Sequence, residues 1–96
     1  MNYFDFCEQS FVMYGPELFK KISADTGITQ DIIAANVGCE YYYETGYNYW
    51  SYEMIRLKIE ETDNPMVKVI FEQILEYIEN GFLPMYFYVL CGYFTF

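Results

Sequence analysis

The sequence predicts a mainly α-helical fold, a small single-domain helical bundle that covers residues 1–96. Apolar residues recur at helical spacing along much of the chain, and capping residues and glycines mark the ends of the expected helices. The chain has 96 residues, near the usual size of one domain, and no repeat, linker or low-complexity tract divides it. A chain of this length can bury a core without disulfide bonds.

The best-defined element is a helix over residues 63–81. Pro65 suits the first helical position, Asp63 or Asn64 can cap the turn before it, and Gly81 suits the stop. We expect its apolar stripe to form the floor on which the rest of the chain packs. The stripe consists of Val67, Ile70, Phe71, Ile74, Leu75 and Ile78, and the opposite face carries Lys68, Glu72, Gln73, Glu76 and Glu79.

Three shorter helices are predicted before residue 39. The first covers residues 3–14 and stops at Gly15-Pro16, and the second covers residues 16–25. The third covers residues 30–37, and a glycine follows each of the last two helices. The residues that define them are Phe4, Cys7, Phe11 and Tyr14 on one face of the first, Leu18, Phe19, Ile22 and the stop Gly27 in the second, and the cap Thr29 and stop Gly38 of the third.

Residues 19–38, FKKISADTGITQDIIAANVG, resemble the helix-turn-helix of phage-repressor-type regulators. The matching positions are Ile22, Ser23, Ala24, Gly27, Ile28 and Ile33. In that family the second helix enters the major groove of DNA. The resemblance implies that Thr29, Gln30, Asp31, Ala34 and Ala35 face the bases. No arginine or lysine stands beside these positions, and Asn36 replaces an apolar residue, so an ordinary helical hairpin is the alternative.

Residues 39–62 are rich in tyrosine and ambiguous in structure. Seven of the twelve positions from Tyr41 to Tyr52 are aromatic. Aromatic residues favour strands, and Thr45-Gly46 is a turn candidate, so a short β-hairpin near 39–59 is one alternative and an irregular loop another. The run 51–62 alternates as a strand would, but Ser51 can also cap a helix there, and its helical neighbours favour the helix.

The apolar run 82–96 is too short and too interrupted to span a bilayer, since it contains Pro84 and Gly92. Its pattern fits either a buried helix from Pro84 or an aromatic strand, and periodicity does not separate the two. We expect this run to lie in the core or in a homodimer interface.

Charge and cysteine content restrict the partners and the compartment. The chain carries 14 acidic and 5 basic residues, a net charge of −9, and no histidine. This charge opposes binding to nucleic acid or to an anionic membrane and suits a basic partner. The 3 cysteines have neither metal-ligand nor redox-motif spacing, so we expect unpaired thiols in a reducing cytosol. The acidic N-terminus without a long apolar run does not fit a signal peptide, which also indicates the cytoplasm.

We expect no enzyme, no catalytic residue, no cofactor and no metal. Without histidine the chain lacks the commonest general base and any Ser-His pair. Its glycines are isolated turn residues rather than a phosphate loop. Pro65 interrupts the oxygen-rich segment 60–64 that could otherwise suggest a calcium loop.

The remaining function class is recognition of another protein. Tyrosine brings a large contact area at low conformational entropy, and interleaved carboxylates attract arginine and lysine. The predicted protein-binding residues are Glu40, Tyr41, Tyr43, Glu44, Tyr47, Tyr49, Trp50, Tyr52 and Glu53, with Glu72, Glu76 and Glu79 as a reserve acidic face.

The sequence therefore predicts a small acidic inhibitor that occupies a basic nucleic-acid-binding surface of a target protein. In type, without a shared motif, it resembles the small acidic anti-defence inhibitors of phages such as anti-CRISPR proteins. That resemblance implies a nuclease or CRISPR effector as the target, in the cytoplasm of a bacterial host, and blocking without turnover. The alternatives are a helix-turn-helix transcriptional regulator, or an interaction module that forms a homodimer through residues 82–96.

Overall fold

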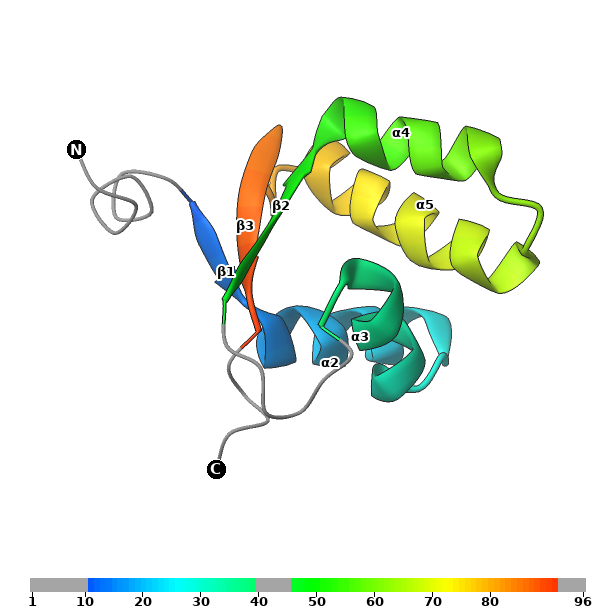
Figure 1. The fold of residues 1–96 in the computed structure, drawn as a ribbon, viewed down its shortest axis with the longest axis horizontal. Helices are drawn as coiled ribbons and strands as arrows, with labels where there is room; N and C mark the ends of the chain where they lie inside the picture. The colour runs from blue at the N-terminus through cyan, green and yellow to red at the C-terminus, as the bar shows by residue number, and fades with distance from the viewer. Residues whose placement is uncertain (1–10, 40–45, 92–96) are drawn as a thin grey trace.

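Four helices and a three-stranded sheet make up the part of the chain that the computed structural model describes, residues 11–39 and 46–91 (Figure 1). The fold is mainly α-helical, with the sheet at one end and the antiparallel pair α4–α5 at the other. In chain order the elements are β1 (Val12–Tyr14), α2 (Gly15–Thr26), α3 (Gln30–Val37), β2 (Tyr47–Ser51), α4 (Tyr52–Glu61), α5 (Pro65–Glu79) and β3 (Tyr86–Leu90).

The sheet has the strand order β1-β3-β2, so the strand that comes last in the sequence lies in the middle. β1 runs parallel to β3 and places Met13 beside Val89, whereas β2 runs antiparallel to β3 and places Trp50 beside Phe87. Because side chains alternate between the two faces of a strand, these four residues share one face. That face packs against the helices, and Phe87 and Val89 are fully buried there.

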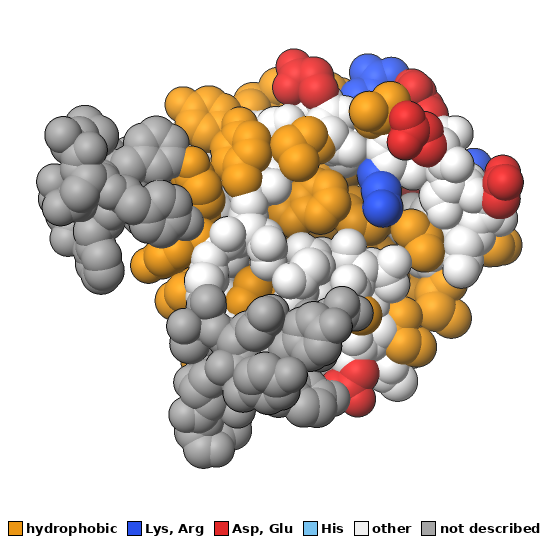
Figure 2. Space-filling view, in the orientation of Figure 1, with side chains coloured by type: hydrophobic (Ala, Val, Ile, Leu, Met, Phe, Trp, Pro, Cys, Tyr) orange, Lys and Arg blue, Asp and Glu red, His pale blue; other side chains and the backbone are white. Residues whose placement is uncertain are grey.

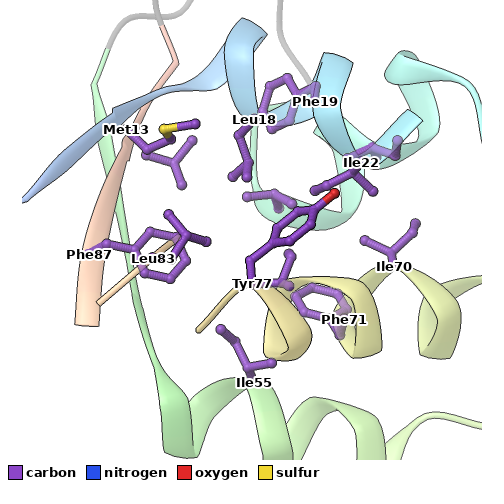
Figure 3. Packing of buried hydrophobic residues seen from close by; sticks show 14 of the residues in the cluster. Met13, Leu18, Phe19, Ile22, Ile55, Ile70, Phe71, Tyr77, Leu83 and Phe87 are labelled. Carbon is purple, nitrogen blue, oxygen red and sulfur yellow. The ribbon is translucent and has the colours of Figure 1, made fainter. Parts of the chain in front are cut away.

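The core lies between the inner face of the sheet and the helices, and α5 contributes most to it (Figure 3). The predicted floor is confirmed, because α5 packs against both α2 and α4. Val67 and Leu75 lie at the edge of the core rather than inside it, and Tyr77 is an additional buried residue. The residues of α5 that are buried are Ile70, Phe71, Ile74, Tyr77 and Ile78.

The predicted helices after residue 15 are confirmed, and so are most of the local signals that predicted them. The Asn64 side chain caps α5 by accepting hydrogen bonds from the backbone N–H groups of Met66 and Val67. Ser51 caps α4 by accepting a hydrogen bond from the Met54 N–H, so the helical alternative for 51–62 is the correct one. Thr29 occupies the cap position of α3 but makes no side-chain capping bond.

The helix predicted for residues 3–14 is wrong at its C-terminal end, where residues 12–14 form β1; residues 3–10 lie outside the described part of the chain. Tertiary pairing with β3 overrides the local helical pattern here. Gly15 permits this pairing, because a Cβ atom at that position would lie 2.7 Å from the Leu90 carbonyl oxygen. The strand and helix α2 can therefore join without an intervening loop.

The alternative of a short β-hairpin near 39–59 is also not found in residues 46–59, the greater part of that range that the structure describes. β2 pairs with the distant β3 rather than with a neighbouring strand, and α4 follows it directly. Of the two alternatives for 82–96, the strand is correct over residues 86–90, while residues 92–96 lie outside the described part. No described helix is long and apolar enough to cross a membrane.

A tyrosine-rich outer face of the sheet

The face of the sheet that points away from the helices is lined with tyrosines. Tyr49 lies directly beside Tyr88, and Tyr14 lies across Leu90 from Tyr47, so all three strands contribute. The sheet alternation sets these side chains opposite to Met13, Phe87 and Val89 of the core. We call this surface the tyrosine face; it consists of Tyr14, Tyr47, Tyr49, Tyr86 and Tyr88, with Val12 and Leu90 among them.

The rings of the tyrosine face are ordered around Tyr88. The Tyr88 ring lies edge-on to the Tyr47 ring, with 6.4 Å between centroids, and 5.2 Å from the Tyr49 ring. Tyr88 is 9% exposed, whereas Tyr49 is 44% exposed and Tyr86 58%. A central ring held by its neighbours and surrounded by accessible rings gives contact area that needs little further ordering on binding.

Charged groups gather elsewhere on the surface. Figure 2 shows hydrophobic side chains over the strands and most of the visible red and blue side chains over α4 and α5. Within residues 11–39 and 46–91 every carboxylate is exposed, and a single ion pair, Lys21–Asp25 at 3.9 Å, is present. These carboxylates belong to Glu17, Asp25, Asp31, Glu53, Glu60, Glu61, Asp63, Glu72, Glu76 and Glu79. The field around the molecule is therefore negative, while the tyrosine face itself is uncharged.

The structure separates the predicted binding residues into three groups. Tyr47 and Tyr49 lie on the tyrosine face. Trp50 points to the other side of β2, where its ring lies 5.1 Å from the Phe71 ring and its Nε1–H donates to the Val37 carbonyl, so it belongs to the core. Tyr52 also packs against the core, and Glu53 is exposed in the first turn of α4. Glu40, Tyr41, Tyr43 and Glu44 lie outside the described residues.

Three members of the tyrosine face were not predicted from the sequence: Tyr14, Tyr86 and Tyr88. The signal for two of them was the alternation YFYVL in residues 86–90, where tyrosines stand two positions apart. Tyr14 carried no such signal, because its strand has only 3 residues.

The reserve acidic residues Glu72, Glu76 and Glu79 are exposed on α5. Glu76 borders an open pocket of about 430 Å³ between α2 and α5 and accepts a hydrogen bond from Gln73. Lys21 occupies this pocket, with its Nζ 4.8 Å from the Phe82 ring centroid and 5.1 Å from that of Tyr77. The protein's own lysine thus already interacts with the rings and the carboxylate of Asp25 that another cation would use.

Tyr77 points from α5 toward α2 (Figure 3). Its hydroxyl donates a hydrogen bond of 2.5 Å to Asp25 of α2. Burial raises the pKa of the Tyr77 phenol well above its usual value, and the neighbouring carboxylate of Asp25 raises it further. The phenol therefore remains a neutral donor in the folded chain at pH values where a tyrosine in the unfolded chain ionises.

Replacing Tyr77 with Phe should lower the free energy of unfolding at neutral pH by about 1 kcal/mol, because the bond to Asp25 is lost. Since the folded-state pKa is raised, this contribution is complete below the unfolded pKa of about 10 and is lost as the pH rises above it. Urea unfolding of both proteins at pH 7 and about pH 11 measures the difference. A gap that widened at alkaline pH would contradict this assignment.

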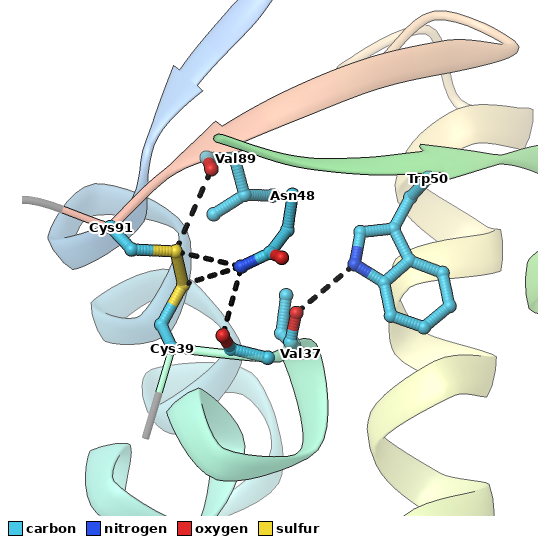
Figure 4. The surroundings of a disulfide bond; sticks show 7 residues. Val37, Cys39, Asn48, Trp50, Val89 and Cys91 are labelled. Atoms are coloured by element: carbon cyan, nitrogen blue, oxygen red, sulfur yellow. Dashed lines mark hydrogen bonds between the residues drawn. A yellow bond between two sulfur atoms is a disulfide. The ribbon is translucent and has the colours of Figure 1, made fainter. Parts of the chain in front are cut away.

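Cys39 and Cys91 form a disulfide bond, so the prediction of unpaired thiols is wrong for these two residues; Cys7 lies outside the described part (Figure 4). The fold brings the end of α3 beside the end of β3, and the two Cα atoms lie 5.4 Å apart. Both cysteines are buried, at 1% and 4% exposure. Sequence spacing gave no indication of the pair, because 52 positions separate them.

Within the described ranges no group of three or more His, Cys, Asp or Glu side chains is placed to hold a metal ion. Comparison of the chain with protein-family models, with curated proteins and with solved structures finds no match.

Proposed function

We propose that this chain is a small acidic inhibitor that binds another protein through the tyrosine face. The observation that carries the proposal is the set of five tyrosines on one side of the sheet, with the Tyr88 ring in contact with the rings of Tyr47 and Tyr49. Tyrosine is enriched at the energetically important centres of protein interfaces. A contiguous set of accessible aromatic rings on a sheet is more typical of an interaction surface than of a surface that stays exposed to solvent.

The partner that suits this surface is a protein with a basic site. The net charge of −9 accelerates encounter with such a site and suppresses binding to acidic surfaces. Tyrosine rings then offer faces on which arginine side chains stack, in addition to their apolar contact. The same arginines and lysines would otherwise contact phosphates, so the bound inhibitor would exclude nucleic acid from the site.

The biological setting is part of the proposal. A nucleic-acid enzyme such as a nuclease or a CRISPR effector presents a basic groove of the required kind, and blocking it needs no turnover. We therefore place the chain among phage or mobile-element anti-defence inhibitors that act in the cytoplasm of a bacterial host. Glu53 and the α5 carboxylates Glu72, Glu76 and Glu79 supply the long-range attraction in this scheme, and the rings supply the contact.

Replacing Tyr49 with Ala should weaken binding to the partner about thirtyfold, since truncation of a central interface tyrosine costs on the order of 2 kcal/mol. The partner is first captured from a bacterial lysate with the tagged chain and identified by mass spectrometry. Binding of the purified partner to wild type and variant is then measured by calorimetry at low and high salt. Leu57→Ala is the matched control, because Leu57 is 52% exposed on α4, away from the tyrosine face.

The proposal is supported if the captured protein binds nucleic acid, if the chain competes with that nucleic acid, and if high salt weakens the complex. Equal affinity of wild type and Tyr49→Ala would exclude the tyrosine face as the binding surface. A captured protein that still bound its nucleic acid normally in the presence of excess chain would exclude inhibition by site occupation.

A helix-turn-helix regulator within a helical bundle is the second candidate, because α3 forms with the predicted bounds and α2 within one residue of them, around the left-handed Gly27. Of the positions that would face DNA, Ala34 is buried, whereas Thr29, Asp31 and Ala35 are exposed. A mobility-shift titration with random duplex DNA tests this candidate, and light scattering tests the predicted homodimer through residues 82–96. A shift below micromolar protein would favour the regulator over the inhibitor.

A further inference from the structure

We propose that the Cys39–Cys91 disulfide is a redox-sensitive lock, opened by a dithiol reductant, that controls the order of the tyrosine face. Its consequence for partner binding rests on the proposed function, but the lock itself is testable on the isolated chain. The proposal starts from position: Cys91 directly follows β3, which carries Tyr86 and Tyr88, and Cys39 lies two residues after Val37, the last residue of α3.

Cys91 joins three elements at one point. Its sulfur is bonded to Cys39, whose own N–H donates to the Ala34 carbonyl of α3. Its backbone N–H donates to the Gly46 carbonyl at 2.9 Å, immediately before β2 begins. Opening the disulfide therefore removes the covalent cross-link between the end of α3 and the end of β3, and leaves the side-chain hydrogen bonds of Asn48 and Trp50 to join α3 to the sheet.

Asn48 supplies the chemistry that makes this bond exchangeable (Figure 4). Its Nδ2 lies on the inner side of β2 and is 2.9 Å from Cys91 Sγ, 3.4 Å from Cys39 Sγ and 2.9 Å from the Gly38 carbonyl oxygen. An amide N–H at this distance stabilises a thiolate, and a stabilised thiolate is the better leaving group in thiol–disulfide exchange. The shorter distance identifies Cys91 as the sulfur that leaves.

The surroundings also suit the reduced form. Cys91 Sγ lies 3.7 Å from the Val89 carbonyl oxygen, which can accept the weak hydrogen bond of a thiol. Asn48 keeps its bond to Gly38 in either state. Reduction therefore leaves the Cys91 thiol and the Asn48 amide with hydrogen-bond partners.

The exchange proceeds in two balanced steps. A thiolate of the reductant attacks Cys39 Sγ, the Cys39–Cys91 bond breaks, and its electron pair leaves on Cys91 as a thiolate that the Asn48 amide holds. The second thiolate of the reductant then attacks the reductant sulfur that is bonded to Cys39 in the mixed disulfide. The reductant is released in its oxidised form, and Cys39 is left as a thiolate. Each cysteine thiolate then takes up a proton from solvent and becomes a thiol.

The proposed compartment points to regulation rather than to permanent reinforcement, whereas burial of the two sulfurs limits the access of a reductant. With residue exposures of 1% and 4%, the disulfide is protected until its surroundings open locally. In a reducing cytoplasm, which the proposed function implies, disulfides that form are usually transient or redox-sensing. We therefore expect the chain to bind its partner more tightly in the oxidised form than in the reduced form.

Hydrogen exchange followed by NMR tests the lock on the full chain before and after dithiothreitol. In the reduced chain, the amides of Asn48, Tyr88 and Cys91 should exchange at least tenfold faster relative to those of Ile74 than in the oxidised chain. The Cys39→Ser/Cys91→Ser double variant should show the same exchange rates as the reduced wild type, and dithiothreitol should not change them. An unchanged ratio, or reduction that occurs only with unfolding of the whole chain, would overturn the proposal.

The role of Asn48 has its own test, with alkylation and mass spectrometry as the readout of reduction by dithiothreitol. Asn48→Ala should slow reduction about tenfold, and Asn36→Ala, which removes an exposed side-chain bond to the Ile32 carbonyl, should not change it. If the alanine variant does not fold, Asn48→Asp keeps the size and should slow reduction by opposing the thiolate. Equal or faster reduction of the folded Asn48 variant would remove Asn48 from the mechanism.

These measurements separate the lock from the proposed function. Faster exchange of the strand amides on reduction, combined with no partner capture by either form, would support the redox-sensitive lock and reject the inhibitor. Capture of a nucleic-acid enzyme with the same affinity by both forms would support the inhibitor and reject redox control.

Discussion

Replacing Cys39 and Cys91 together with Ser is expected to lower the free energy of unfolding by about 4 kcal/mol, the value that chain entropy gives for closing a loop between residues 52 positions apart. The stability of a domain this size is roughly 5–15 kcal/mol, so the variant should fold at moderate temperature but with little reserve. The melting temperature should fall on the order of 15–30 °C.

Urea unfolding followed by circular dichroism measures this loss in the oxidised wild type, in the wild type with dithiothreitol, and in the double variant. The last two should agree, and dithiothreitol should have no effect on the variant. If the oxidised and reduced wild types unfolded at the same urea concentration, the disulfide would contribute nothing to stability and the loop-closure argument would fail.

Replacing Phe71 with Ala is expected to cost about 3–5 kcal/mol, because a fully buried ring leaves a cavity in the centre of the core. Phe71 lies on α5 between the helices and the sheet, with the Trp50 ring 5.1 Å away. The loss is comparable with the total stability of a small domain, so much of the variant population should be unfolded or loosely packed.

The fluorescence of Trp50 is a direct readout of this change, because the chain has 1 tryptophan and it contacts the substituted ring. The emission should shift to the red in Phe71→Ala. Val69→Ala is the matched control, since Val69 is 43% exposed on the same helix and should cost no more than about 0.5 kcal/mol. Similar losses in the two variants would show that α5 does not form the floor of the core.

The helices could be predicted from the sequence because their signals are local. The cap at Asn64, the proline after it and the cap at Ser51 each act within three residues, and the structure shows each of these capping bonds. The strands were harder to predict because their partners are distant. Nothing near Val12–Tyr14 indicates that it pairs with β3, and a three-residue strand has too short a pattern to compete with a helical one.

The candidate site could be predicted only in part, because its arrangement also depends on strands that are distant in the sequence. The density of tyrosines indicated Tyr47 and Tyr49, but it did not indicate which side chains share one face of the sheet. The alternation along β2 places Trp50 on the opposite face, in the core. Tyr86 and Tyr88 belong to a run that fitted a buried helix equally well, so their side of the sheet appeared only once β3 had paired. The Cys39–Cys91 pair depends on the whole fold and had no local signal.

The central place of β3 has a consequence for how the chain reaches its structure during synthesis. β1 and β2 do not pair with each other, and each needs β3, which the ribosome adds after every other helix and strand described here. The helices can form as they emerge. The two outer strands keep unpaired backbone N–H and C=O groups until β3 is made, and such groups favour association with other chains. The sheet and its tyrosine face are therefore completed last, and the disulfide can form by oxidation only after Cys91 has been added.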